Sequence, residues 1–405
     1  MRVTRLTGLA VAAALGVALA RLLPASRWSL HGRVAIVTGG SRGLGLELAQ
    51  EIARRGGRLV ICGREDSTLE AAVARLRENS AAVVGLRCDV GDPTQAQRLV
   101  EQTRQTYGRI DLVVNNAGII DVGPQETMHT EDYHAALDTM FWGPLHVTQA
   151  AVPELRATKG RILNVTSIGG RTSVSRLLPY CSAKFAALAF SEGMTAAMMR
   201  QGVSVTTAVP GMMRTGSHWH ARFRGAPRGE YSWFALAASL PVLSINAHRA
   251  ARRMIDAVCA GRSHLTLTPM AHMASLAHGI APGLTTRALG VVDALLPRAK
   301  TSTVRSGAAA EAELRTPIIP WLTQANAAAG RELHQQSSTD GAAPDTAQEA
   351  TADTAAAVAA AEPEPDFADE HTLSESKPSA QEPRGKGSEA PHRPTRLDGG
   401  PARPV

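Results

Sequence analysis

The chain has 405 residues, enough for two ordinary domains, but its composition changes along its length, so we do not expect one core to extend over all of it. The formal charge of +7 comes from scattered arginines without a basic block that carries interleaved aromatic residues, which argues against nucleic-acid binding. The four cysteines lie far apart without a C-x-x-C pair, so neither a metal site nor a disulfide framework is expected.

The amino-terminal segment is apolar. Residues 6–20 carry no charge, and Arg21 is followed by two leucines, which brings the apolar run close to the ~20 residues that a membrane span needs. Two interpretations remain for this segment. One is a secretory signal cleaved near Ala18-Leu-Ala20, and the other is an uncleaved membrane anchor over residues 1–27.

A glycine-rich turn follows the first expected strand, residues 33–38. Gly39-Gly-Ser-Arg-Gly-Leu-Gly45 leads from this strand into an amphipathic helix that ends near Gly56. In such a turn, small residues let the backbone approach a pyrophosphate, and the free N–H groups at the helix start favour the anion. The turn therefore predicts a dinucleotide site with the contacts Gly39, Ser41, Arg42, Gly43, Leu44 and Gly45.

The second expected strand, residues 58–62, indicates which dinucleotide is bound. An acidic residue at its end would bind the ribose 2′-hydroxyl of NAD, but this chain has Gly63-Arg64 there. Two guanidinium groups, from Arg64 and Arg42, suit a 2′-phosphate. We therefore expect NADP(H) as the preferred cofactor. NAD(H) is the alternative, in which Arg64 is only solvated and Glu65 contacts the ribose.

Further strands alternate with helices through the middle of the chain. Strand 82–87 leads to Asp89, a candidate to bond the adenine amino group or to cap the next helix, and strand 110–114 ends in Asn115-Asn-Ala-Gly118. This alternation is typical of an α/β protein with a doubly wound parallel sheet, the Rossmann fold. Ligands of such sheets bind at the carboxyl ends of the strands, where these motifs fall.

The candidate reactive groups follow the strand that begins at Leu163. Ser167 starts a loop after this strand, and Tyr180 and Lys184 open a long helix that ends near Arg200. Tyr180 and Lys184 are four residues apart, so they share one helix face. An ammonium group beside the phenol is expected to lower its pKa toward neutrality, and the Ser167 hydroxyl would steady a carbonyl oxygen. Such a set suits the reduction of a ketone or the oxidation of an alcohol.

Together these motifs resemble those of the short-chain dehydrogenases/reductases. The resemblance spans roughly residues 30–267 and rests on Thr38-Gly-Gly-Ser-Arg-Gly-Leu-Gly45, Asn115-Asn-Ala-Gly118, Ser167, Tyr180-Cys-Ser-Ala-Lys184 and Pro210-Gly-Met-Met-Arg-Thr215. It implies that Ser167, Tyr180 and Lys184 are catalytic and that Tyr180 and Lys184 also contact the cofactor. It further implies a homo-oligomer and additional cofactor contacts from Asn115, Ala117, Gly118, Pro210, Gly211 and Thr215.

One position departs from the family pattern. Met140 stands where the family usually carries an asparagine that supports a proton-relay water. This departure keeps a second hypothesis open, in which the chain is a non-catalytic NADP(H)-binding sensor or scaffold at the membrane. The intact set of Ser167, Tyr180 and Lys184 argues against that hypothesis.

The segment after Thr215 is suited to a substrate lid. Aromatic residues gather in 216–243 although they make up only 4% of the chain, which points either to a sizeable apolar substrate or to rings that only pack the lid. Residues 270–300 are apolar and read as a helical extension. Residues 301–405, rich in Ala, Pro, Glu and Ser, predict a mostly disordered tail.

These observations define an expected organisation and activity. Residues 1–27 form an anchor and residues 28–269 a single catalytic domain on the cytoplasmic side of the membrane, because an exported enzyme would be separated from its cytosolic dinucleotide. The predicted function is the NADP(H)-dependent interconversion of a carbonyl and a secondary alcohol. The expected substrate is a small hydrophobic one, such as a lipid or a sterol, and Tyr180 exchanges the proton.

Overall fold

The computed structural model describes residues 28–78, 82–239, 244–296, 298, 301–314 and 331–333. The chain divides into two units, residues 1–340 and 341–405, and all described residues belong to the first. The predicted anchor, residues 1–27, and the predicted tail beyond residue 333 lie outside them. Among the residues that the structure describes, no helix combines the length and the apolarity that a membrane crossing requires.

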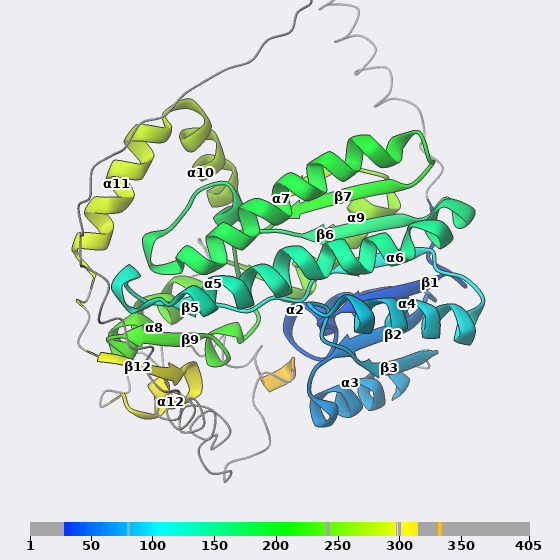
Figure 1. Cartoon of the computed structure of the whole chain (residues 1–405), viewed down its shortest axis with the longest axis horizontal. Coiled ribbons are helices and arrows are strands. Elements are labelled where there is room, and N and C mark those ends of the chain that lie inside the picture. The colour runs from blue at the N-terminus through cyan, green and yellow to red at the C-terminus, as the bar shows by residue number, and fades with distance from the viewer. Residues whose placement is uncertain are drawn as a thin grey trace, which may run out of the picture. The chain divides into compact units, whose positions relative to one another are not determined.

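A parallel sheet of seven strands organises the domain (Figure 1). Its order is β11-β7-β6-β4-β1-β2-β3, so the strand order reverses between β1 and β4. This confirms the predicted doubly wound sheet and places its topological switch point beside the glycine-rich turn. The strands are β1 (Val34–Thr38), β2 (Arg58–Gly63), β3 (Val83–Arg87), β4 (Leu112–Asn115), β6 (Arg161–Val165), β7 (Ser204–Val209) and β11 (His264–Thr266).

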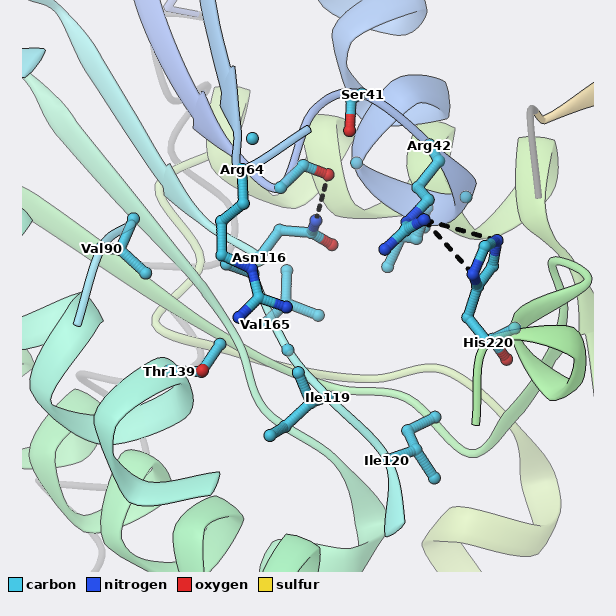
Figure 2. Close-up of a pocket in the computed structure, with 18 of the residues that line it drawn as sticks. Ser41, Arg42, Arg64, Val90, Asn116, Ile119, Ile120, Thr139, Val165 and His220 are labelled. Carbon is cyan, nitrogen blue, oxygen red and sulfur yellow. Dashed lines mark hydrogen bonds between the residues drawn. The ribbon is translucent and has the colours of Figure 1, made fainter. Parts of the chain in front are cut away.

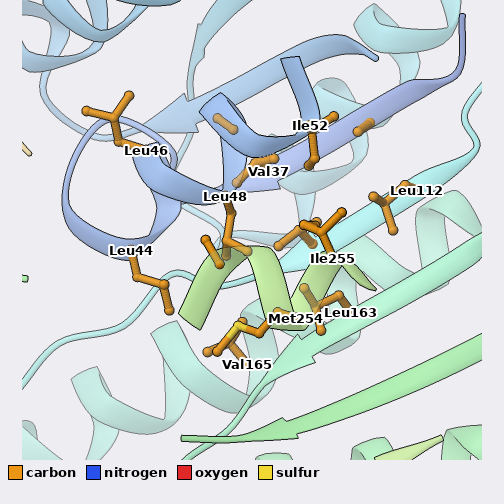
Figure 3. Close-up of a cluster of buried hydrophobic side chains, with 14 of the residues drawn as sticks. Val37, Leu44, Leu46, Leu48, Ile52, Leu112, Leu163, Val165, Met254 and Ile255 are labelled. Atoms are coloured by element: carbon orange, nitrogen blue, oxygen red, sulfur yellow. The ribbon is translucent and has the colours of Figure 1, made fainter. Parts of the chain in front are cut away.

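Helices cover both faces of the sheet because the strands bury side chains on both sides. Val37 of β1 points to the face covered by α2 (Gly43–Arg54), α3 (Asp66–Glu78) and α9 (Ala247–Cys259), where it meets Leu48 and Ile255 (Figure 3). Ile36 points to the opposite face, which α4 (Pro93–Tyr107), α6 (Gly143–Thr158) and α7 (Leu178–Met199) cover. Successive strand residues alternate between the two faces, so both layers are anchored by the same short strands.

The segment that follows β7 forms the lid together with the chain after residue 300. In it, β9 (Arg222–Gly225) pairs with β5 (Asp121–Val122) in parallel and with β12 (Thr301–Ser306) in antiparallel register. Helix α12 (Gly307–Ala312) then packs on α8 (Pro227–Ser239). The predicted boundary at residue 300 is therefore wrong, since residues 301–314 complete the lid through backbone pairing that no local pattern revealed.

The lid aromatics pack against one another. Phe223 and Tyr231 are fully buried, and their ring centroids lie 5.6 Å apart in an edge-to-face contact. His218 is also buried beside Tyr231, and burial lowers the His218 pKa to about 4. Of the two interpretations offered by the sequence, the structure therefore supports packing of the lid by these rings.

Two further helices follow β11. Helices α10 (Pro269–Ile280) and α11 (Pro282–Ala294) pack against each other as a hairpin in the region where the sequence predicts a helical extension. Shorter elements complete the domain, namely α5 (Thr130–Leu137), β8 (Met212–Arg214), β10 (Ser244–Asn246), the π-helical turn η2 (Asp138–Trp142) and the 3-10 turns η1 (Gln125–Thr127), η3 (Ile168–Gly170), η4 (Ser175–Leu177) and η5 (Ser217–Trp219).

Candidate active site

A cleft of about 920 Å³ opens at the carboxyl ends of the strands (Figure 2). The structure brings together in it nearly all of the residues that the sequence singled out for the cofactor and for catalysis. They are Gly39, Ser41, Arg42, Gly43, Leu44, Gly45, Arg64, Asp89, Ala117, Gly118, Ser167, Tyr180, Lys184, Pro210, Gly211 and Thr215. The convergence follows from the fold, because the loops after parallel strands meet at one edge of the sheet.

The glycine-rich turn is shaped by close backbone approaches. Gly39 has a φ of 61°, and a Cβ there would lie 2.9 Å from the Ala117 Cα. A Cβ at Gly45 would lie 2.0 Å from the Gly39 carbonyl oxygen, so the first turn of α2 can pack onto the loop only without a side chain. The backbone at the start of α2 therefore remains bare toward the cleft, as a pyrophosphate cradle requires.

Asn116 holds this turn in place. Its side-chain amide donates to the carbonyls of Thr38 and Gly39, at 3.1 and 3.2 Å. The Thr38 hydroxyl in turn accepts from the backbone N–H of Asn116, which locks the loops after β1 and β4 together. Sequence reasoning missed Asn116, although its place in the Asn115-Asn-Ala-Gly118 motif was the available signal.

Asn115, unlike the other predicted cofactor contacts, is not among the residues that line the cleft. It is buried behind the cleft and donates to Asn164 (2.8 Å) and Thr148 (3.0 Å). Asn164 continues to Ser191, and Ser191 to Thr207, so a buried polar chain crosses β4, β6, α7 and β7. The strand alternation directs Asn115 into the core while the next residue faces the cleft.

Two guanidinium groups mark the far end of the cleft. Arg64 extends from the end of β2, and Arg42 reaches across to His220 of the lid, with Nη1–Nδ1 at 3.3 Å (Figure 2). Burial lowers the pKa of Arg42, Glu65 raises it from 3.7 Å away, and the like charge of Arg64 lowers it again. The two arginines are thus close enough to interact, which makes this end of the cleft a site for an anion.

Asp89 lies in the cleft wall after β3. Its Oδ1 accepts from the Gly91 N–H at 3.0 Å, which shapes the local turn. The cap of α4 is instead Asp92, whose carboxylate accepts from the N–H groups of Thr94 and Gln95. The alternative role proposed for Asp89 as a helix cap is therefore wrong, and Asp89 keeps its place on the cleft wall.

Ser167, Tyr180 and Lys184 occupy the other end of the cleft. Ser167 starts the turn η3 and accepts from the Gly169 N–H at 3.0 Å, and a hydrogen bond joins its side chain to that of Tyr180. A Cβ at Gly169 would lie only 3.2 Å from the Tyr180 ring, so the glycine lets the phenol sit against the loop. The Lys184 Nζ donates to the Val165 carbonyl at 2.9 Å.

The electrostatics of these groups differ from the expectation. Burial raises the pKa of Tyr180 to about 12, and the hydrogen bond with Ser167 opposes this rise only in part. Burial also lowers the pKa of Lys184 to about 8. The predicted lowering of the Tyr180 pKa by Lys184 is therefore wrong for this arrangement, because the Lys184 Nζ is directed at Val165 and lies 5.8 Å from the centre of the Tyr180 ring.

Met140 lies inside the π-helical turn η2 and is buried. It packs in one small cluster with Ala136, Ala183 and Tyr180, and its sulfur lies 3.3 Å from a Cβ placed at Gly118. The position of the family asparagine is thus apolar and sits directly against the catalytic helix. Wide turns of this kind are frequent at functional sites.

A segment from the far carboxyl-terminal part of the chain reaches the cofactor end of the cleft. The N–H of Gly43 donates to the Leu333 carbonyl at 2.9 Å, and Leu333 is buried. Arg75 of α3 binds the neighbouring Glu332 through the Glu332 carbonyl. One backbone N–H group at the start of α2 is therefore engaged by the chain's own residues 331–333.

Among the described residues, no cluster of three or more His, Cys, Asp or Glu side chains could hold a metal.

Comparison with known proteins identifies the family. The model of the short chain dehydrogenases matches residues 33–223. An uncharacterized oxidoreductase of Staphylococcus saprophyticus is 32% identical over 205 residues, which cover 49% of this chain and 88% of the relative. The chain therefore belongs to the short chain dehydrogenase family.

Two further similarities bear on the site. An 11-beta-hydroxysteroid dehydrogenase-like protein (4A) of Arabidopsis thaliana is 36% identical over 195 residues, or 46% of this chain, and the match spans 63% of that relative's length. The crystal structure of a gluconate 5-dehydrogenase from Burkholderia cenocepacia in complex with NADP and tartrate superimposes with a TM-score of 0.54 at 25% identity. It covers 61% of this chain and 98% of the other.

Proposed function

We propose that this protein is an NADP(H)-dependent oxidoreductase that interconverts a carbonyl and a secondary alcohol on a hydrophobic substrate. The observation that carries the proposal is the arrangement of one cleft, with Arg42 and Arg64 at one end and Ser167, Tyr180 and Lys184 at the other. The bare backbone at Gly39 and Gly45 lies between these ends and fits a pyrophosphate.

Each part of the cofactor can be assigned to particular residues of the cleft. Arg42 and Arg64 would hold the 2′-phosphate, the turn at residues 39–45 the pyrophosphate, and Pro210, Gly211 and Thr215 the nicotinamide end. The nicotinamide supplies or accepts the hydride. The NADP in the related gluconate 5-dehydrogenase structure supports the preference for NADP(H).

The proton chemistry belongs to the chain's own side chains. Tyr180 donates a proton to the substrate oxygen during reduction and accepts it during oxidation, while Ser167 holds that oxygen. With its pKa at about 12, Tyr180 is a protonated donor at neutral pH, which suits the reductive direction. Lys184 lies on the next helical turn and lines the same cleft, where its ammonium group would contact the cofactor.

The hydrophobic character of the substrate rests on two supports. Ile119, Ile120 and Ala221 are among the apolar residues that line the cleft. The similarity to a hydroxysteroid dehydrogenase-like protein points in the same direction. Because the aromatic lid residues pack away from the cleft, they do not contribute to this argument.

The test is NADPH oxidation by the full chain across steroid, fatty and aromatic carbonyls, with Tyr180→Phe as the matched inactive variant. We expect the wild type to turn over at least one of these carbonyls. Tyr180→Phe should lose this turnover and still bind NADPH. NADPH binding without turnover on any carbonyl would favour the alternative function, a non-catalytic NADP(H) sensor, for which the apolar Met140 in place of the relay asparagine is the supporting observation.

We also propose that residues 1–27 anchor the chain with its catalytic domain on the cytoplasmic side, and that it forms a homo-oligomer through α7. The uncharged run at residues 6–20 supports the anchor, and the exposed Phe185 on α7 supports the contact. Removal of residues 1–27 should convert a protein that only detergent extracts into one that a high-salt wash releases from the membrane. Sedimentation of the released domain should give a dimer or a tetramer.

A further inference from the structure

The hairpin of α10 and α11, residues 269–296, exposes an unusual amount of apolar surface. In Figure 1 it stands apart from the sheet, with the turn between the two helices at its far end. Ile280 and Leu284, at this turn, are 75% and 70% exposed. The other exposed apolar residues recur at helical spacing along the two helices and are Met270, Met273, Leu276, Val291, Val292 and Leu295.

The hairpin carries few charged side chains, and its negative charge faces the domain. Within residues 269–296 the charged side chains are Arg287, which is exposed, and Asp293. The Asp293 carboxylate accepts from the Ser175 hydroxyl and from Arg176 Nε, both at 2.6 Å, so it faces the domain. The turn at residues 276–284 contains no Lys, Arg, Asp or Glu. The outer surface is therefore apolar with a positive charge and no outward carboxylate.

This composition fits a lipid surface better than a second protein. Protein interfaces place a polar rim with hydrogen-bonding groups around an apolar centre. Here Ile280 and Leu284, 75% and 70% exposed, occupy the tip, where a bilayer would receive them first, while Leu295, 82% exposed, lies at the other end of α11. The helices have 12 and 13 residues, or roughly 20 Å each at 1.5 Å per residue, too short to span a bilayer but long enough to lie in its interfacial layer.

The hairpin is tied to the catalytic loops. Helix α10 packs against η3, directly after Ser167, and α11 packs against η4, shortly before Tyr180. Arg176 of η4 is buried and donates both to Asp293 on α11 and to Glu230 on the lid helix α8, at 2.6 Å each. One buried guanidinium thus connects the hairpin, the loop between the catalytic residues and the lid.

We propose that the α10–α11 hairpin is a membrane-docking element whose tip inserts into the interfacial layer of an anionic bilayer, with Arg287 near the headgroups. Docking follows from the hairpin's own surface and does not depend on catalysis. Its consequence, delivery of a hydrophobic substrate from the bilayer to the loops beside Ser167 and Tyr180, rests on the proposed function.

The test measures hydrogen exchange over residues 270–292 of the full chain, with and without vesicles of phosphatidylcholine and phosphatidylglycerol. We expect exchange of the hairpin amides to slow by about tenfold or more on vesicles. Leu284→Asp should abolish this protection, and Ile280→Asp should do so independently. Thr286→Asp is the matched control, because it adds the same charge two residues away at an exposed polar position and should keep the protection.

Three outcomes would overturn the proposal. The first is no protection of the wild-type hairpin on vesicles, and the second is equal protection in Leu284→Asp and Ile280→Asp. The third is protection that grows with protein concentration in the absence of vesicles, which would make a second copy of the chain the occupant. Turnover of a small water-soluble ketone in the same samples reports the proposed function separately, and it should persist in all three variants.

Discussion

Burial of the Lys184 ammonium should lower the free energy of unfolding, although the active site needs this lysine. Replacement by methionine keeps the length of the side chain and removes the charge. We therefore expect Lys184→Met to lose turnover by about a hundredfold or more, because the cofactor loses its contact with the ammonium group. The same variant should show a distinctive change in the pH dependence of its stability.

The magnitude follows from the Lys184 pKa, which burial lowers from 10.5 to about 8. At about 1.36 kcal/mol per pKa unit, the buried ammonium costs about 3 kcal/mol at neutral pH. The hydrogen bond to Val165 offsets about 1.5 kcal/mol or more of this cost. At pH 7, Lys184→Met should therefore be no less stable than the wild type.

The sign of the pH effect is set by the order of the two pKa values. Since the folded-state pKa of Lys184 lies below the unfolded one, the unfolded chain binds more protons between pH 8 and 10.5. The wild type should gain about 2 kcal/mol relative to Lys184→Met between pH 7 and about pH 9.5. Urea unfolding at the two pH values measures this difference.

The control is Lys159→Met, at an exposed position, which should show no such pH-dependent difference from the wild type. A stability difference between Lys184→Met and the wild type that is the same at both pH values would refute the reasoning. It would mean that the ammonium stays hydrated in the folded protein, so that its pKa is the same in the folded and the unfolded state.

Three other predictions concern the cofactor end of the cleft. Arg64→Ala should raise the KM for NADPH by about 10- to 100-fold and leave that for NADH nearly unchanged, and equal effects on both cofactors would contradict a 2′-phosphate contact. Gly45→Ala should abolish binding of either cofactor in calorimetry, since its Cβ would meet the Gly39 carbonyl at 2.0 Å. A chain ending at residue 330 should bind NADPH more tightly than one ending at residue 340, because it lacks the Leu333 carbonyl that engages Gly43. Equal dissociation constants for the two chains would show that residues 331–333 do not compete with the cofactor.

The sequence was most informative where a motif and a strand end coincide. The glycine-rich turn, Arg64 and Tyr180 each follow or face the end of a strand, so a correct strand order was enough to bring them into one cleft. The position of Asn115 behind the cleft has a related cause. Asn115 and Asn116 are consecutive residues at the end of β4, so one side chain must face the core and the other the cleft. The sequence pattern did not reveal that Asn116 is the one that faces the cleft.

The pKa of Tyr180 could not be derived from spacing. The four-residue separation from Lys184 correctly predicted that the two side chains share a helix face. The spacing does not determine how deeply the phenol is buried or that the Val165 carbonyl receives the ammonium group. Both depend on packing against a loop and a strand that lie elsewhere in the sequence.

The contacts that the lid and the hairpin make with the rest of the domain could not be predicted from the sequence. Their connections are ion pairs and strand pairs between segments far apart in the chain, such as Arg176 with Asp293, 117 residues later. A buried arginine in a loop has no local signature, because charged residues in loops are ordinarily solvated. Once Asp293 is engaged by Arg176, however, the hairpin's remaining surface becomes nearly free of charge. The same buried contact that completes the loop beside Tyr180 therefore also gives the hairpin the apolar outer surface on which its proposed docking depends.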